Sequence, residues 1–276
     1  MTNDLNFYDE FKEWYVQIAD CFKFDYQKDC ESRDFLQQIL SKKSPNWNVG
    51  MILESFKKML ASKQLILIYG CGPSLEDTVE TLIDLKGIRF FDNFINLTAD
   101  GASILLRENN IPIDAIFTDL DGITQNEFLY SHFNVVHAHG DNIDKLKLFE
   151  EMILNFDNII GTTQVEPLGN VINPGGFTDG DRIMYFIHTL INPSQKLYLI
   201  GMDFKKIIGK YSKLDLERNQ EGSLIKQKKL QFGVKLLEWL TSRILNDIYL
   251  VNSNKISDKF KYITLDQFLK NHNFLY

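Results

Sequence analysis

The sequence has little of what builds disulfide frameworks, zinc sites or membrane spans. Its 276 residues include three cysteines, Cys21, Cys30 and Cys71. Their number is odd and their spacing fits no metal site, so we expect buried free thiols. No run of eighteen apolar residues occurs, and the first residues, Met1 to Asp4, lack the basic segment of a signal peptide. These absences predict a cytoplasmic protein that does not enter a membrane.

A basic excess is absent as well. Lysine and arginine number 30 against 37 aspartates and glutamates, giving a formal net charge of −7. Such a chain repels polyphosphate backbones at long range, which argues against a nucleic-acid partner. The local sign can still differ, because a metal ion can bridge acidic side chains to phosphates. Apolar residues, in contrast, are plentiful at 44%, enough for a sizeable core.

The spacing of apolar residues divides the chain into three predicted regions. Residues 1–50 form an N-terminal helical region, because apolar residues recur at helical spacing as far as about Lys43 and Pro45 then interrupts the pattern. Residues 51–215 alternate short apolar runs with amphipathic stretches, which is typical of an α/β domain with a Rossmann-like, mainly parallel sheet flanked by helices. Residues 216–276 are expected to pack on this domain as a long helix, a strand and a short helix. The predicted strands and final helix are Leu65–Tyr69, Phe94–Thr98, Ala115–Thr118, Val135–His137, Asn158–Ile160, Leu197–Ile200, Ile248–Val251 and Leu265–Lys270.

A glycine-rich turn follows the first predicted strand, at the sheet edge where open parallel sheets bind ligands. It reads Gly70-Cys71-Gly72-Pro73-Ser74. The two glycines permit close approach of the backbone, and Pro73 suits the first turn of a helix whose free N–H groups attract phosphate. The spacing matches neither the dinucleotide fingerprint nor the Walker A loop. A plain strand-to-helix turn is therefore an equally open interpretation.

Carboxylates follow the next two predicted strands. Asp100 and Gly101 come after the second strand, and Asp119 and Asp121 come after the third. Residues two apart in an extended segment point the same way, so Asp119 and Asp121 can face one spot. Two like charges about 4 Å apart repel by roughly 4 kcal/mol at an effective dielectric of about 20, and a cation relieves that repulsion. Mg²⁺ fits best, because it prefers carboxylate oxygens and is shared with substrate phosphates. Alternatively, Asp121 caps the next helix.

Two histidines stand in the segment after the fourth predicted strand, which reads His137-Ala138-His139-Gly140-Asp141-Asn142. Such a group could bind a transition metal, but the chain offers no cysteine partner and no helical His-Glu-x-x-His pairing. We therefore expect these histidines to hydrogen-bond phosphate or to orient the carboxylates, with zinc ligation as the alternative.

The segment from Asn173 to Arg182 carries the strongest functional signal. Its glycines let the backbone approach a ligand, and Thr178 or Asp179 can cap a helix that begins at once. Arg182 then lies in the first helical turn, where its charge opposes the helix dipole. This placement indicates an anion such as phosphate, or else a neighbouring aspartate, as the partner of Arg182.

Two further polar groups occur later in the chain. Asp203 ends the sixth predicted strand and adds a carboxylate at the same sheet edge. Three lysines, Lys226, Lys228 and Lys229, stand early in the long helix. We expect them to form a solvated basic face, with a phosphate contact as the alternative.

With these residues in order, the chain resembles the archaeal-type 6-hydroxymethyl-7,8-dihydropterin pyrophosphokinases, a family distantly similar to thiamine pyrophosphokinase. The resemblance covers about residues 65–204 and depends on a set of short motifs in consistent order. The central domain is also similar to that of flagellin-modifying motility accessory factors. The matching motifs are Gly70-Cys71-Gly72-Pro73-Ser74-Leu75, Ala99-Asp100-Gly101-Ala102, Thr118-Asp119-Leu120-Asp121-Gly122, His137-Ala138-His139-Gly140-Asp141-Asn142, Thr162-Thr163-Gln164, Gly175-Gly176-Phe177-Thr178-Asp179-Gly180-Asp181-Arg182 and Gly201-Met202-Asp203-Phe204.

The resemblance implies transfer of pyrophosphate from ATP to the hydroxymethyl group of a reduced pterin, with release of AMP. It implies Mg²⁺ as the metal, with Asp119 and Asp121 as its ligands. The catalytic residues that it implies are Asp119, Asp121, Asp179, Asp181 and Arg182. The nucleotide- and substrate-binding residues that it implies are Gly70, Gly72, Pro73, Ser74, Asp100, Gly101, His137, His139, Asp141, Asn142, Thr162, Thr163, Gln164, Gly175, Gly176, Phe177 and Thr178.

Other functions stay open at this point. Thiamine could replace the pterin as acceptor, the chain could be a sugar-nucleotide-dependent glycosyltransferase like the motility factors, or it could bind nucleotide without catalysis. The expected partners are small molecules, namely ATP and a reduced pterin alcohol. The aromatic N-terminal helices are a candidate contact in a homo-oligomer.

Overall fold

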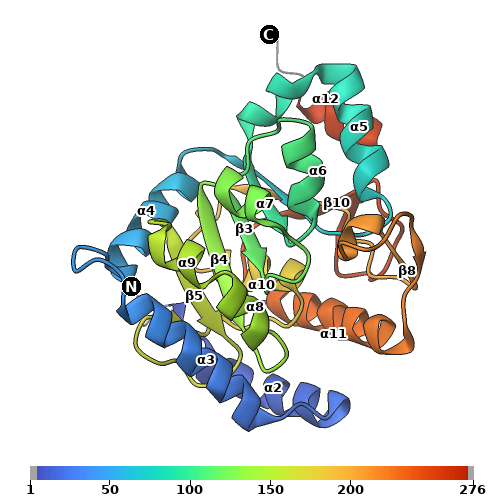
Figure 1. The fold of residues 1–276 in the computed structure, drawn as a ribbon. Coiled ribbons are helices and arrows are strands. Elements are labelled where there is room, and N and C mark those ends of the chain that lie inside the picture. The colour runs from blue at the N-terminus through green and yellow to red at the C-terminus, as the bar shows by residue number, and fades with distance from the viewer. Residues whose placement is uncertain (1–4, 273–276) are drawn as a thin grey trace.

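A nine-stranded sheet organises the protein, as a computed structural model shows for residues 5–272 (Figure 1). Residues 1–4 and 273–276 lie outside the described range, and so does the N-terminal segment judged above for a signal peptide. The strand order is β11-β10-β7-β1-β2-β3-β4-β5-β6, and its eight pairings are all parallel. The predicted α/β class is therefore confirmed. The strands are β1 Leu65–Tyr69, β2 Ile95–Ala99, β3 Ala115–Thr118, β4 Phe133–Ala138, β5 Ile159–Thr163, β6 Val171–Ile172, β7 Lys196–Ile200, β10 Ile248–Val251 and β11 Lys261–Ile263.

Helices cover both faces of this sheet. They are α2 Tyr8–Phe22, α3 Tyr26–Ser41, α4 Val49–Ala61, α5 Leu75–Lys86, α6 Ala102–Glu108, α7 Gln125–Tyr130, α8 Ile143–Leu148, α9 Glu150–Asn155, α10 Asp179–Ile187, α11 Leu224–Thr241 and α12 Leu265–Asn271. Two 3₁₀ helices, η1 Ile88–Asn93 and η2 Lys210–Ser212, and an antiparallel hairpin of β8 Ile207–Ile208 with β9 Gln220–Glu221 complete the elements. Within residues 5–272, no helix combines the length and the apolar character that crossing a bilayer requires.

Side chains of β1 show how the sheet is buried. Alternate residues of a strand point to opposite faces. Ile66 and Ile68 accordingly pack into one core cluster with α4 and α10, whereas Leu67 and Tyr69 pack into another with α5 and α12. Because both faces are covered, the strand is a continuous apolar run without polar alternation, as parallel strands usually are.

The predicted N-terminal helices exist as α2 and α3, and both pack on the sheet domain. Phe11 and Ile18 of α2 belong to the large core cluster. α3 lies beside β5, α8 and α9 (Figure 1). It comes so close that a Cβ atom on Gly161 of β5 would lie 2.7 Å from a methyl group of Leu40. The domain boundaries after residues 50 and 215 stay a prediction.

The short strands are the elements that the sequence did not predict. β6, β8 and β9 have two residues each and β11 has three, so none shows a readable alternation. The long helix after Gly222 and the strand Ile248–Val251 are confirmed. This strand pairs with β7, so the C-terminal part of the chain extends the same sheet.

One buried lysine joins the end of α3 to α9. Nζ of Lys43 donates hydrogen bonds of 2.8 Å to the carbonyl oxygens of Ile153, Leu154 and Phe156. These carbonyls close the C-terminal end of α9, where helices leave acceptors without partners. The lysine therefore supplies the donors that the helix end lacks.

We predict that Lys43→Met lowers the free energy of unfolding by about 2 kcal/mol, because a charged donor to three carbonyls is lost. Urea denaturation measures this change. Lys42→Met is the matched control: Lys42 forms an exposed ion pair with Glu150, and its loss should cost less than about 0.5 kcal/mol. Equal effects of the two substitutions would contradict the assignment.

Candidate active site

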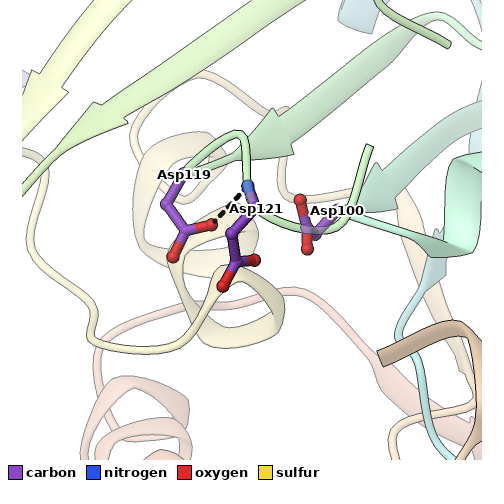
Figure 2. A group of neighbouring side chains, drawn as sticks. All are labelled: Asp100, Asp119 and Asp121. Carbon is purple, nitrogen blue, oxygen red and sulfur yellow. Dashed lines mark hydrogen bonds between the residues drawn. The ribbon is translucent and has the colours of Figure 1, made fainter. Parts of the chain in front are cut away.

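Three carboxylates meet where β2 and β3 end. Asp100 follows β2, Asp119 and Asp121 follow β3, and one oxygen of each lies within 4.8 Å of the other two (Figure 2). The side chain of Thr118 donates a 2.7 Å hydrogen bond to Asp100, and the backbone N–H of Asp121 donates one of 3.3 Å to Asp119. The structure thus brings Asp119 and Asp121 together as their spacing predicts. Three oxygen donors at one point suit a hard cation such as Mg²⁺.

The backbone bends sharply to create this cluster. Asp100 has a φ of 45° and Leu120 one of 71°. Both angles fall in the left-handed region, which residues other than glycine rarely adopt. Gly122 is needed for the close approach, because a Cβ atom there would lie 1.9 Å from a carboxylate oxygen of Asp100. Asp121 does not cap the next helix, since Thr124 caps α7 in a capping box with Glu127. The helix-cap alternative for Asp121 is therefore wrong.

Crowding changes the acidity of these groups. Burial and the charge of Asp119 raise the pKa of Asp121 to about 6, and the same two causes raise the pKa of Asp179 to about 8. Burial also raises the pKa of Asp100 well above its usual value. Although burial opposes it, a hydrogen bond with His139 holds the pKa of Asp119 below its usual range. A cation would relieve the repulsion that these shifts express.

The two histidines occupy different places in the site. Nε2 of His139 lies 3.1 Å from a carboxylate oxygen of Asp119, so this ring orients the carboxylate. His137 is buried, with Nδ1 3.1 Å from the hydroxyl of Thr162 and no hydrogen-bond partner for Nε2. Asn142 donates to the backbone oxygens of His137 and Asp119 and so ties the two loops together. Within residues 5–272, the cluster suited to a metal contains aspartates and no histidine, which favours the orienting role over zinc ligation.

The glycine segment before α10 shapes the next part of the site. Gly175 and Gly176 have φ angles of 83° and 87°, and the chain then enters α10 through a capping box of Thr178 with Asp181. Asp181 is fully buried, and its two carboxylate oxygens accept hydrogen bonds from Phe177 and Thr178. Thr178 is thus the cap, as predicted. Asp181 is occupied in holding this turn, whereas Asp179 lines the cleft.

Arg182 is buried in the first turn of α10 and keeps one donor free. Its Nε donates a 3.0 Å hydrogen bond to the carbonyl of Phe177, and one terminal nitrogen donates to Gln164 at 3.3 Å. The other terminal nitrogen, Nη1, has no hydrogen-bond partner. Within residues 5–272, no ion pair of 4.0 Å or less joins Arg182 to an aspartate, although the charges of Asp179 and Asp181 act on it. An anion from outside as its partner stays a prediction.

The glycine turn after β1 is held mainly by the protein itself. The backbone N–H and the hydroxyl of Ser74 both donate to Asp203 at 2.9 Å. The N–H groups of Gly70 and Gly72 donate to the carbonyls of Ile200 and Gly201. Asp203 thus anchors the start of α5 instead of adding a free carboxylate, and this geometry favours the plain strand-to-helix turn.

Two cavities meet at the acid cluster. The main cleft has a volume of about 270 Å³ and is lined by Asp100, Asp119, Asp121, Asp179, Arg182, Lys226 and Lys229, among others. The side pocket has about 90 Å³ and is lined by Gly70, Gly72, Met202, Phe204, Ile208 and Leu230, among others. Asp100, Asp179 and Lys226 line both. Two separate ligands can therefore meet at the carboxylates.

Several residues predicted for the site do not line the main cleft. Gly101 packs against the backbone of Tyr211, and Pro73 accepts a hydrogen bond from Asn219 through its carbonyl. Asp141 lines a neighbouring pocket with His139 and Gln164, and Thr162 lines a small cavity with His137 and Arg182. Thr163 is buried at the end of β5.

Sequence reasoning missed the contribution of the N-terminal helices to the site. Asp29 of α3 is buried and accepts hydrogen bonds from the hydroxyl of Tyr15, the side chain of Gln164 and the backbone N–H of Gly140. Phe24, between α2 and α3, lines the main cleft. The weak signal available was an aspartate next to Cys30 on a helix whose other buried residues are mostly apolar.

Comparisons with known proteins identify the family of this chain. Residues 40–208 match the family described as 6-hydroxymethylpterin diphosphokinase MptE-like. Proteins named 6-hydroxymethyl-7,8-dihydropterin pyrophosphokinase are 35% identical in Pyrococcus furiosus, over 84% of this chain and 94% of the relative, and 36% identical in Methanocaldococcus jannaschii, over 85% and 97%. One in Methanothermobacter thermautotrophicus is 33% identical, over 82% and 92%.

A solved glycosyltransferase of the MAf type from Magnetospirillum magneticum is also similar, at 15% identity and a TM-score of 0.43, over 84% of this chain and 42% of that one. The family match, in contrast, includes the motifs that build the acid cluster. Three relatives match this chain over most of their own length. The chain belongs to the MptE-like 6-hydroxymethylpterin diphosphokinase family.

Proposed function

We propose that this protein is a 6-hydroxymethyl-7,8-dihydropterin pyrophosphokinase, which transfers pyrophosphate from ATP to the pterin hydroxymethyl group and releases AMP. The named relatives support this activity. One structural observation carries it: four aspartates and a buried arginine with a free donor line one cleft. Transfer of phosphoryl groups depends on such positioning and charge neutralisation.

The residues fit Mg²⁺, with Asp100 joining Asp119 and Asp121 as a third ligand. Their oxygens converge, and oxygen is the donor that this ion prefers. Bound there, Mg²⁺ would neutralise phosphate charge and polarise the phosphoryl oxygens. His139, whose Nε2 lies 3.1 Å from one oxygen of Asp119, would hold this carboxylate in place for the ion.

The other residues of the site position the reactants. In the reaction, the pterin hydroxyl oxygen forms a bond to the β-phosphorus of ATP, and the bond from that phosphorus to the oxygen of AMP breaks. Asp179 is the cleft carboxylate outside the metal cluster, and in its ionised form it is the group that would accept the hydroxyl proton. Arg182 offers Nη1 to a phosphate oxygen, and Asp181 fixes the turn that presents both residues.

The proposal includes a cytoplasmic location, where ATP is available, and ATP and a reduced pterin alcohol as partners. Association of copies through the N-terminal helices stays a prediction. Most of the aromatic side chains of α2 pack into the core of the chain itself.

An acceptor assay tests the proposed activity. Purified protein, ATP, Mg²⁺ and 6-hydroxymethyl-7,8-dihydropterin should yield AMP and the pterin diphosphate in equal amounts, with little AMP when the acceptor is omitted. Thiamine is offered in parallel. If thiamine supports more AMP release than the pterin does, thiamine is the acceptor. If neither alcohol yields AMP, the proposal is refuted.

We predict that Asp119→Asn and Asp121→Asn each lower kcat by about a hundredfold or more, because each removes a charge that holds the cation near the phosphates. Both variants should fold, since the change preserves shape. Asp144→Asn, at an exposed position of α8, is the control and should keep full activity. Near wild-type turnover in both cluster variants would exclude the metal site.

We predict that Mg²⁺ affinity falls as the pH drops through about 6. Asp121 has a pKa of about 6 in the folded protein, so below that pH a proton competes with the ion for the carboxylate. Below that pH the dissociation constant should rise by up to about tenfold per pH unit, as measured by calorimetry, and the raised pKa of Asp100 adds to the effect. A flat profile for the wild type would contradict the prediction.

A further inference from the structure

The helix α11 directs two lysines into the main cleft. Lys226 and Lys229 are three residues apart and therefore share one face of the helix. Both line the main cleft, whereas Lys228 is exposed and does not. Of the two interpretations of these lysines, a solvated face fits Lys228, and a phosphate contact stays a prediction for Lys226 and Lys229.

Neither lysine has a counter-ion of its own. Within residues 5–272, no ion pair of 4.0 Å or less involves Lys226 or Lys229. Lys229 is half-buried, and burial lowers its pKa, with the charge of Lys226 as the next cause. The charges of Asp141 and Asp119 also act on Lys229, but neither aspartate forms an ion pair with it, so a ligand that supplies negative charge in the cleft would stabilise this ammonium group.

Aromatic rings fix the position of Lys229. Its Nζ lies 5.3 Å from the ring centre of Phe24 and 5.8 Å from that of Phe177. Both rings line the main cleft. A cation at this distance from an aromatic face is attracted to it. These contacts favour a position of the ammonium group at the cleft.

The two lysines share the cleft with Arg182, which is 7% exposed and has one nitrogen without a hydrogen-bond partner. Lys226 also lines the side pocket and so stands at the junction of the two cavities, near Asp100 and Asp179, while Lys229 lines the main cleft alone. Three cations from α10 and α11 thus accompany the carboxylates along one cleft. A ligand that touches both sets must be an extended anion that also carries a metal ion.

We propose that Lys226 and Lys229 bind the triphosphate chain of the nucleotide in the main cleft, together with Arg182. The identity of the nucleotide rests on the proposed function, but the anion site depends only on the three cations and their cleft. The side pocket, which shares one of these cations, is left for an uncharged ring system. This places the phosphates between the acid cluster and α11.

Calorimetric titration with Mg²⁺ and a non-hydrolysable ATP analogue tests the proposal. Lys226→Gln and Lys229→Gln should each raise the dissociation constant about tenfold, which corresponds to one lost charged hydrogen bond. Lys228→Gln, on the same helix, should stay within about twofold of the wild type. Unchanged melting temperatures would show that the variants fold.

Inorganic triphosphate serves as a second probe. The same loss of affinity for triphosphate and for the nucleotide analogue is expected, because the lysines contact phosphate. Wild-type affinity in both cleft variants, an equal loss in Lys228→Gln, or a loss for the analogue alone would overturn the assignment.

The outcome is separate from that of the acceptor assay. Lysine-dependent binding by a protein that releases no AMP would refute the proposed function and keep this site. Pyrophosphate transfer that both cleft substitutions leave unchanged would refute this site and keep the proposed function.

Discussion

Repulsion among carboxylates at one edge of the sheet is the constraint on which the site depends. β2 and β3 run side by side in parallel, so the loops after them emerge together and bring Asp100 to Asp119 and Asp121. The protein keeps these groups close at a cost, through left-handed backbone at Asp100 and Leu120 and through raised carboxylate pKa values. Strain and like charge held by a rigid scaffold are common where a ligand completes the balance.

The positive groups of the site come from elements that are distant in the sequence. Arg182 lies in the first turn of α10, and the lysines lie near the start of α11. Phe24, whose ring contacts Lys229, comes from the turn between α2 and α3. The net charge of −7 therefore says little about the field inside the cleft. The site also depends on Asp29 of α3, because this residue accepts hydrogen bonds from Gln164 and Gly140 beside the cleft.

The sequence predicted what local rules govern. Three strands, Leu65–Tyr69, Ala115–Thr118 and Ile248–Val251, have the expected bounds, and the two-residue spacing of Asp119 and Asp121 predicted their convergence. Contacts between distant segments were not predictable. Ser74 and Asp203 both stood at the sheet edge in the prediction, but their bond exists because β7 lies next to β1, an order that the sequence does not contain. The roles of Asp29 and Lys229 were hidden for the same reason.

The place of β7 in the sheet also matters for anyone who works with pieces of this chain. β7 is an interior strand only because β10 and β11, which come after α11, pair beyond it. A recombinant fragment that stops at residue 208, where the family match ends, would lack both strands and the apolar face of α11. Its β7 would become an unprotected edge, which is a template for aggregation between copies.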